Sequence, residues 1–88
     1  MYNYLAEFLG TLVFVYSILL SGNPLIIGLT LALVILATSS FSGGHINPAV
    51  TVVMASINKL PMNDVIPYVL SQIFGGLCAV EVYKRYKF

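Results

Sequence analysis

Side chains able to do acid–base, nucleophilic or metal chemistry are few in this chain and far apart. Its 88 residues include one histidine, His45, one cysteine, Cys78, and three carboxylates, Glu7, Asp64 and Glu81. A metal cluster or a catalytic triad needs several such groups brought together, and this set offers too few. The sequence therefore predicts a protein that is not an enzyme and that holds no metal or cofactor.

The remaining polar chemistry is hydrogen bonding, and it is concentrated in residues 42–57. The run Ser-Gly-Gly-His-Ile at 42–46 predicts irregular backbone, and Asn47-Pro48 then opens an uncharged apolar piece ending at Ile57. Asparagine is a good N-cap and proline suits the first helical position, so a helix should begin here. The Asn47 side-chain oxygen can cap this helix while its NH2 group donates elsewhere.

Composition indicates that these residues lie in a membrane. Hydrophobic residues make up 59% of the chain and charged residues 8%, whereas a soluble domain has roughly 25% charged residues. So few charges cannot coat a soluble surface, and so apolar a chain would not stay disordered. The net charge of +1 also argues against nucleic-acid binding, which needs a basic stripe.

Three apolar stretches are long enough to cross a bilayer. They cover residues 4–21, 25–41 and 65–82, with 17 or 18 residues each, and a spanning helix needs about 17 to 25. Small residues spaced four apart favour helix contacts in membranes. Such rows occur at Ser71, Gly75 and Ala79 and at Gly28 and Ala32, and we expect both to be contact faces.

The apolar piece at 48–57 has only ten residues, so as a helix it would extend about 15 Å, half of a ~30 Å hydrocarbon layer. It is either a re-entrant half-helix lining a cavity or an interfacial helix lying flat on the bilayer. Interfacial helices usually carry a basic face, and this piece has no charge, which favours re-entry. We therefore predict one all-α, multi-pass membrane domain over 1–88, with three spans and a re-entrant segment at 42–57.

At residues 42–51 the sequence SGGHINPAVT resembles the major intrinsic protein family, the aquaporins and glycerol facilitators. The run AEFLGT at 6–11 resembles the opening of that family's first helix, and Tyr68, Gln72 and Gly75 resemble residues of its third helix. The resemblance covers the whole chain but only half of a family member. Family channels contain two inverted repeats, each with three spans and one Asn-Pro-Ala half-helix.

Because one repeat is present, the resemblance implies that a lone chain forms no pore. The other half would be a second copy inserted upside down, giving an antiparallel dimer, or a different half-repeat. By analogy with the family's fourfold assembly, eight chains would form the full complex. Other expected partners are membrane lipid, water and small neutral solutes, and none is a nucleic acid.

The two ends of the predicted bundle differ in charge. One carries the free N-terminus, a lysine and an aspartate, and the other carries three cations and a glutamate. These residues are Lys59 and Asp64 at the first end and Glu81, Lys84, Arg85 and Lys87 at the second. The positive-inside rule favours a cytosolic C-terminus, but by only two charges, so the preference for one orientation is modest.

The resemblance implies a passive channel for water, with glycerol or other small neutral solutes as further candidates. Asn47 and its copy would donate to solutes where two half-helix N-termini meet, and glycine-rich backbone would supply carbonyl acceptors. By position relative to Asn47, the outer constriction would have an apolar wall without a cation, formed by Ile27, Ile35, Gly44 and Val50. The predicted pore-lining residues are Asn47, Pro48, Ala49, Gly43, Gly44, His45, Ile27, Ile35 and Val50.

Glu7 lies inside an apolar span, where a charge costs at least about 2.5 kcal/mol and marks a function or a partner. It could couple transport to protons, or it could brace the re-entrant loop. The resemblance favours the brace, with loop N–H groups or Gln72 as partners and Tyr68 as a further support. The alternatives to a channel are a dual-topology, proton-coupled small-molecule exporter using Glu7 and a truncated fragment that transports nothing.

Overall fold

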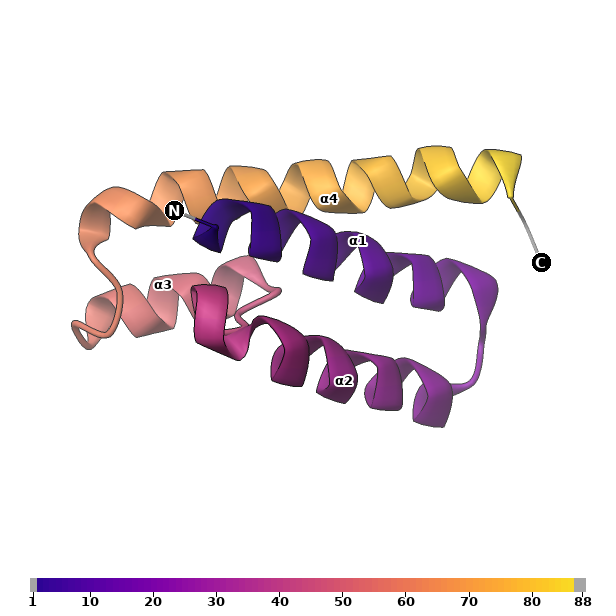
Figure 1. Ribbon diagram of the computed structural model, residues 1–88, viewed down its shortest axis with the longest axis horizontal. Coiled ribbons are helices and arrows are strands. Elements are labelled where there is room, and N and C mark those ends of the chain that lie inside the picture. Colours follow the sequence, from indigo (N-terminus) through magenta and orange to yellow (C-terminus); the bar gives the residue numbers. More distant parts are fainter. Residues whose placement is uncertain (1, 87–88) are drawn as a thin grey trace.

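The computed structural model describes residues 2–86, and these residues form an all-helical bundle (Figure 1). Helix α1 covers Asn3–Leu20, α2 covers Pro24–Ser42, the short α3 covers Pro48–Ser56, and α4 covers Val65–Arg85. A 3-10 turn, η1, at Met62–Asp64 leads into α4. Lys87, one of the three cations assigned to the second end, lies outside the described residues.

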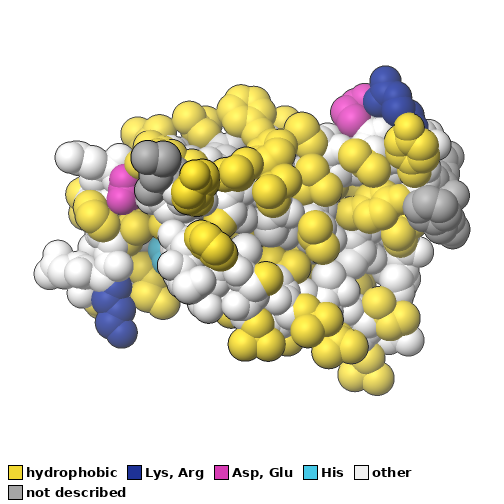
Figure 2. Space-filling view, viewed as in Figure 1, with side chains coloured by type: hydrophobic (Ala, Val, Ile, Leu, Met, Phe, Trp, Pro, Cys, Tyr) yellow, Lys and Arg dark blue, Asp and Glu magenta, His cyan; other side chains and the backbone are white. Residues whose placement is uncertain are grey.

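Three helical segments are long and apolar enough to cross a membrane: Asn3–Leu20, Pro24–Ser42 and Met62–Arg85. The bundle is 40 Å along its longest axis, and the charged side chains visible on the face in Figure 2 lie toward the two ends with hydrophobic side chains between them. At one end Glu81 pairs with Lys84 and Arg85 at 3.5 and 3.4 Å. The chain is a multi-pass integral membrane protein.

Two Asn-Pro pairs begin the helices on either side of the irregular segment. The Asn23 side chain accepts from the Leu25 N–H at 2.8 Å to cap α2, and Asn47 caps α3 from the equivalent position. In each case proline takes the first helical position, where its missing N–H costs nothing. The C-cap of α2 is Gly43, whose left-handed φ of 87° suits glycine.

Helix α1 packs between α4 and α2, and α3 packs against α4 (Figure 1). The α1–α4 contact is very close at Gly75, where a Cβ atom would lie 2.4 Å from the Phe8 carbonyl oxygen. Ala79, one turn further, has no exposed surface. The row that begins at Ser71 is therefore a contact face. The other row is not packed within the chain, because Gly28 and Ala32 are exposed and nothing approaches the Gly28 Cβ position within 4 Å.

Candidate functional site: the tip of the half-helix and the loop before it

Helix α3 has nine residues and lies along the long axis of the bundle beside α4 (Figure 1). Its length is about 14 Å, roughly a third of the 40 Å long axis of the bundle. The Asn47 Oδ1 atom accepts from the Ala49 N–H at 2.7 Å. Asn47, Pro48 and Ala49 are exposed and Val50 is half-buried, and we call residues 47–49 the tip. The capping bond uses the amide oxygen of Asn47 and leaves its NH2 group directed elsewhere.

The loop at 43–46 has an unusual backbone. Gly43, Gly44 and Ile46 have positive φ angles of 87°, 65° and 59°. Glycine adopts this region freely, but a β-branched residue there is a genuine outlier. Ile46 is nevertheless almost fully buried, and its Cδ1 atom lies where it would come within 2.7 Å of a Cβ on Gly10. The Ile46 side chain thus fills the space beside Gly10 and fixes the loop against α1.

Glu7 has no exposed surface and accepts four hydrogen bonds. Its Oε1 atom accepts from the Ile46 N–H and the Gln72 Nε2, each at 2.8 Å. Its Oε2 atom accepts from the Ser42 hydroxyl at 2.5 Å and the His45 N–H at 3.1 Å. One carboxylate on α1 therefore joins the end of α2, the loop and α4, and its acceptor capacity is used within the chain.

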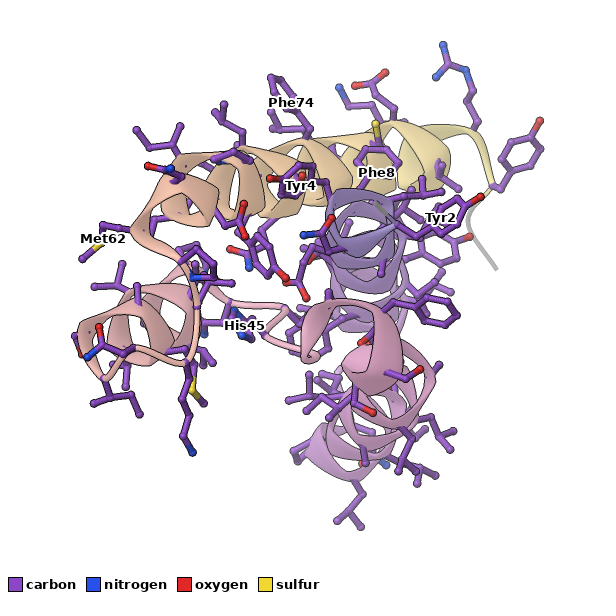
Figure 3. All side chains as sticks on the ribbon, turned by 60° about the vertical axis from the view of Figure 1, so that its left-hand side comes forward. Tyr2, Tyr4, Phe8, His45, Met62 and Phe74 are labelled. Carbon is purple, nitrogen blue, oxygen red and sulfur yellow. The ribbon has the colours of Figure 1, made fainter. Side chains whose placement is uncertain are left out.

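Thr51, one turn into α3, is the centre of a second set of bonds. It is fully buried, and its hydroxyl lies 2.9 Å from both His45 Nδ1 and Gln72 Nε2. The Gln72 amide therefore bridges Glu7 and Thr51. His45 lies between α3 and the end of α2 (Figure 3), and its ring centroid is 5.0 Å from that of Tyr68.

Tyr68 supports the loop from α4. Its hydroxyl donates to the Ser42 carbonyl at 2.8 Å, at the point where α2 ends. Ser42 and Thr51 hold the loop at two places, and sequence reasoning assigned neither of them a role. The only signal was that both belong to the run SGGHINPAVT, with Thr51 one helical turn after Asn47.

The four positions proposed for the outer wall are not all brought together. Ile35 lies against the loop, because a Cβ on Gly44 would be 3.2 Å from the Ile35 carbonyl oxygen. Ile27 precedes Ile35 by eight residues on α2, so it lies about 12 Å away along the helix axis. Val50 is in α3 beside the tip. Within one chain these positions are spread over different depths.

A comparison with protein families matches residues 1–87 to the family described as "Major intrinsic protein". The chain belongs to the major intrinsic protein family. It is 37% identical to "Glycerol uptake facilitator protein-like 6" of Lactiplantibacillus plantarum, a match that covers 98% of this chain and 44% of the relative. It is 37% identical to "Aquaporin Z" of Photorhabdus laumondii over 88% of this chain and 40% of the relative.

A plant relative, "Aquaporin NIP1-1" of Arabidopsis thaliana, is 36% identical over 85% of this chain and 30% of its own length. The chain thus spans less than half the length of these curated relatives.

Major intrinsic proteins are channels and not enzymes. In residues 2–86 no three His, Cys, Asp or Glu side chains lie close enough to hold a metal ion.

Proposed function

We propose that this chain is half of a passive transmembrane channel for water and small neutral solutes, completed by a second, antiparallel copy. The observation that carries the proposal is the short helix α3, which begins at the exposed Asn47-Pro48-Ala49 tip and is much shorter than the 40 Å bundle. A helix of this length cannot cross the hydrocarbon layer. An opposing half-helix would continue the path from the other side.

Selectivity in this proposal comes from the tip. Each half-helix N-terminus carries roughly half a positive charge, and two of them would face the same constriction. The Asn47 NH2 groups would hold the oxygen of a water molecule or a hydroxyl group, while the positive potential opposes cations, including protonated water. Neutral solutes would pass and ions would be excluded.

Glu7, Tyr68 and Gln72 serve in this proposal as supports that set the position of Asn47. The support for this role is that all four bonds to Glu7 come from groups of the chain itself. A proton-carrying carboxylate of an exporter has to reach solvent and substrate, whereas Glu7 has no exposed surface. These contacts favour the channel over the proton-coupled exporter.

The proposed outer wall is apolar. Ile27, Ile35, Gly44 and Val50 offer few donors, and no lysine or arginine lies between residues 1 and 58. Two antiparallel copies would place the same wall at both mouths of the pore. A constriction without a fixed cation should be permissive, so we include glycerol-sized solutes.

The test is osmotic shrinkage of vesicles that contain the purified chain, compared with protein-free vesicles. Asn47→Asp keeps an N-capping oxygen but removes the NH2 donor and adds a negative charge. We expect it to abolish water flux above background, while the helical content stays the same. Asn63→Asp, the same change at an exposed position in η1, is the matched control and should conduct normally. Equal flux in both variants would contradict the proposal.

A further inference from the structure

An apolar groove runs between α1 and α2, which lie side by side in opposite directions (Figure 1). It consists of two adjoining cavities of about 370 and 290 Å³ that share Leu9, Ala37 and Thr38 in their lining. On α2 the lining extends from Thr30 to Phe41, so the groove is about 16 Å long. Because it follows two spanning helices, the groove leads into the hydrocarbon layer from one membrane surface.

The groove and the loop lie on different faces of α1. Glu7 bonds the loop and Thr11 lines a cavity beside the tip, whereas Leu5, Leu9 and Val13 line the groove. Successive helical residues are turned by about 100°, which places the first pair on one side of α1 and the other three on the opposite side. The groove therefore opens away from the tip, toward the surrounding lipid.

The hydroxyl groups along the groove already have partners in α2 itself. Thr30 donates to the Ile26 carbonyl and Thr38 donates to the Val34 carbonyl, each at 2.8 Å. A polar ligand would find few groups to bond in this lining, and its own hydrogen bonds would be lost on entry. An apolar ligand has no such cost, so the lining favours hydrocarbon.

The groove is narrower than a helix. The two volumes spread over its length give a mean cross-section of at most roughly 40 Å², whereas a helix about 10 Å across occupies roughly 80 Å². A second copy could therefore fill the groove only with separate side chains, but a hydrocarbon chain can follow it from end to end. Lipid also reaches it directly, because the wall residues Leu9 and Leu33 are 48% and 57% exposed.

We propose that this groove binds one straight acyl chain of a membrane phospholipid. The acyl chain would enter between Tyr2 and Phe41, where α1 begins and α2 ends, and the headgroup would stay at that membrane surface. Tyr2 is 62% exposed, and tyrosine is favoured at the membrane interface. The gain is van der Waals contact with both walls, since lipid tails are as apolar as the groove. This site is separate from the proposed pore and needs no second copy.

Thermal unfolding in a steroid-based detergent tests the fit, because such a detergent has no alkyl tail to occupy the groove. Dimyristoyl phosphatidylcholine, with straight chains, should raise the thermal midpoint by several degrees as a ligand of the folded state. Diphytanoyl phosphatidylcholine has the same headgroup and methyl-branched chains, and it should raise the midpoint much less. An equal rise with both lipids overturns the proposal.

A substitution in the groove assigns the effect to this site. Ala37→Leu fills the middle of the groove and should remove the difference between the two lipids. Ala32→Leu is the matched control, the same change at another exposed position of α2, outside the lining of both cavities, and it should keep the difference. If Ala37→Leu responds to the two lipids as Ala32→Leu does, the groove is not the site.

Photolabelling locates the acyl chain on the unaltered protein. The protein is reconstituted with a phosphatidylcholine that carries a diazirine in the middle of one acyl chain, and mass spectrometry identifies the labelled peptides. Labels should concentrate on the groove walls of α1 and α2 and be few on the exposed apolar side chains of α4, which include Leu70, Phe74 and Leu77. Even labelling of both surfaces means ordinary lipid contact, and stronger labelling of α4 means that another copy covers the groove. Either result overturns the proposal.

Discussion

The loop and the tip are neighbours in sequence, but the loop is held by hydrogen bonds to a buried side chain, whereas the tip is exposed. In the loop, the His45 and Ile46 N–H groups donate to the Glu7 carboxylate, which has no exposed surface. At the tip, Asn47, Pro48 and Ala49 are exposed, in a protein whose surroundings are largely lipid. Residues 2–86 therefore hold the loop in place but leave the tip exposed.

The same contrast appears in the two rows of small residues. The row through Gly75 and Ala79 is buried against α1, whereas Gly28 and Ala32 are exposed on α2. Helix α1 therefore covers the small residues of α4, whereas the small residues of α2 contact no other helix among residues 2–86. The scaffold is held by contacts within the chain, whereas in the proposed channel the exposed tip needs a second copy, so changes in the two regions should have different consequences.

The largest effect on stability and water flux is expected from Glu7→Gln, which disturbs the hydrogen bonds that hold the loop. Glutamine has one acceptor oxygen, so its NH2 group would face either the Ile46 or the His45 backbone N–H. We expect the free energy of unfolding to fall by about 2 to 3 kcal/mol, together with complete loss of water flux. Chemical unfolding in detergent and vesicle shrinkage measure the two effects. Glu81→Gln at the exposed end of α4 is the control, and a Glu7→Gln variant that conducts normally would show that the loop needs no brace.

An intermediate effect is expected at the contact between α1 and the loop. In Gly10→Ala the new Cβ would lie 2.7 Å from Ile46 Cδ1, which forces the loop to shift and should reduce water flux severalfold. Ile46→Val removes that Cδ1 atom. The double variant should therefore recover part of the lost flux, because only the contacts with Val34 and Thr38 stay tight. No recovery would show that the Ile46 side chain does not position the loop.

The smallest effect is expected from Ile27→Phe, at the proposed outer wall. A larger ring there should slow glycerol more than water and leave the fold intact, since Ile27 is half-buried on α2. Parallel shrinkage measurements with impermeant and glycerol gradients give the ratio of the two fluxes. Ile26→Phe, on the exposed neighbouring position, should leave that ratio unchanged. The wall assignment fails if Ile27→Phe behaves in the same way.

Much of the fold could be predicted from the lengths of the apolar runs in the sequence. Apolar runs of 17 or 18 residues predicted the three spans, and the ten-residue run after Asn47 predicted a short helix. Asn23 was not recognised as a cap, although its pairing with Pro24 repeats the Asn47-Pro48 pattern. The row at Gly28 and Ala32 stays a prediction, because its residues are exposed in the single chain and spacing does not say whether the same chain or another supplies the partner.

The details of the site depended on tertiary contacts that no local pattern contains. The left-handed backbone of Ile46 opposes the preference of a β-branched residue, and it is held by the Glu7 bond and by packing at Gly10. Thr51 offered no separate signal, since a threonine in a helix commonly bonds its own preceding turn. Its contacts with His45 and Gln72 join residues from α3, the loop and α4.

An experiment that mixes wild-type and inactive chains tests most directly whether two copies share one pore. Wild-type chains and nonconducting Asn47→Asp chains are combined in equal amounts before reconstitution, at constant total protein, and water flux is measured. Random pairing predicts that about a quarter of the wild-type flux remains, since both members of a pair must be intact. If about half remains, each chain conducts independently of its neighbours, and the account of a shared pore is contradicted.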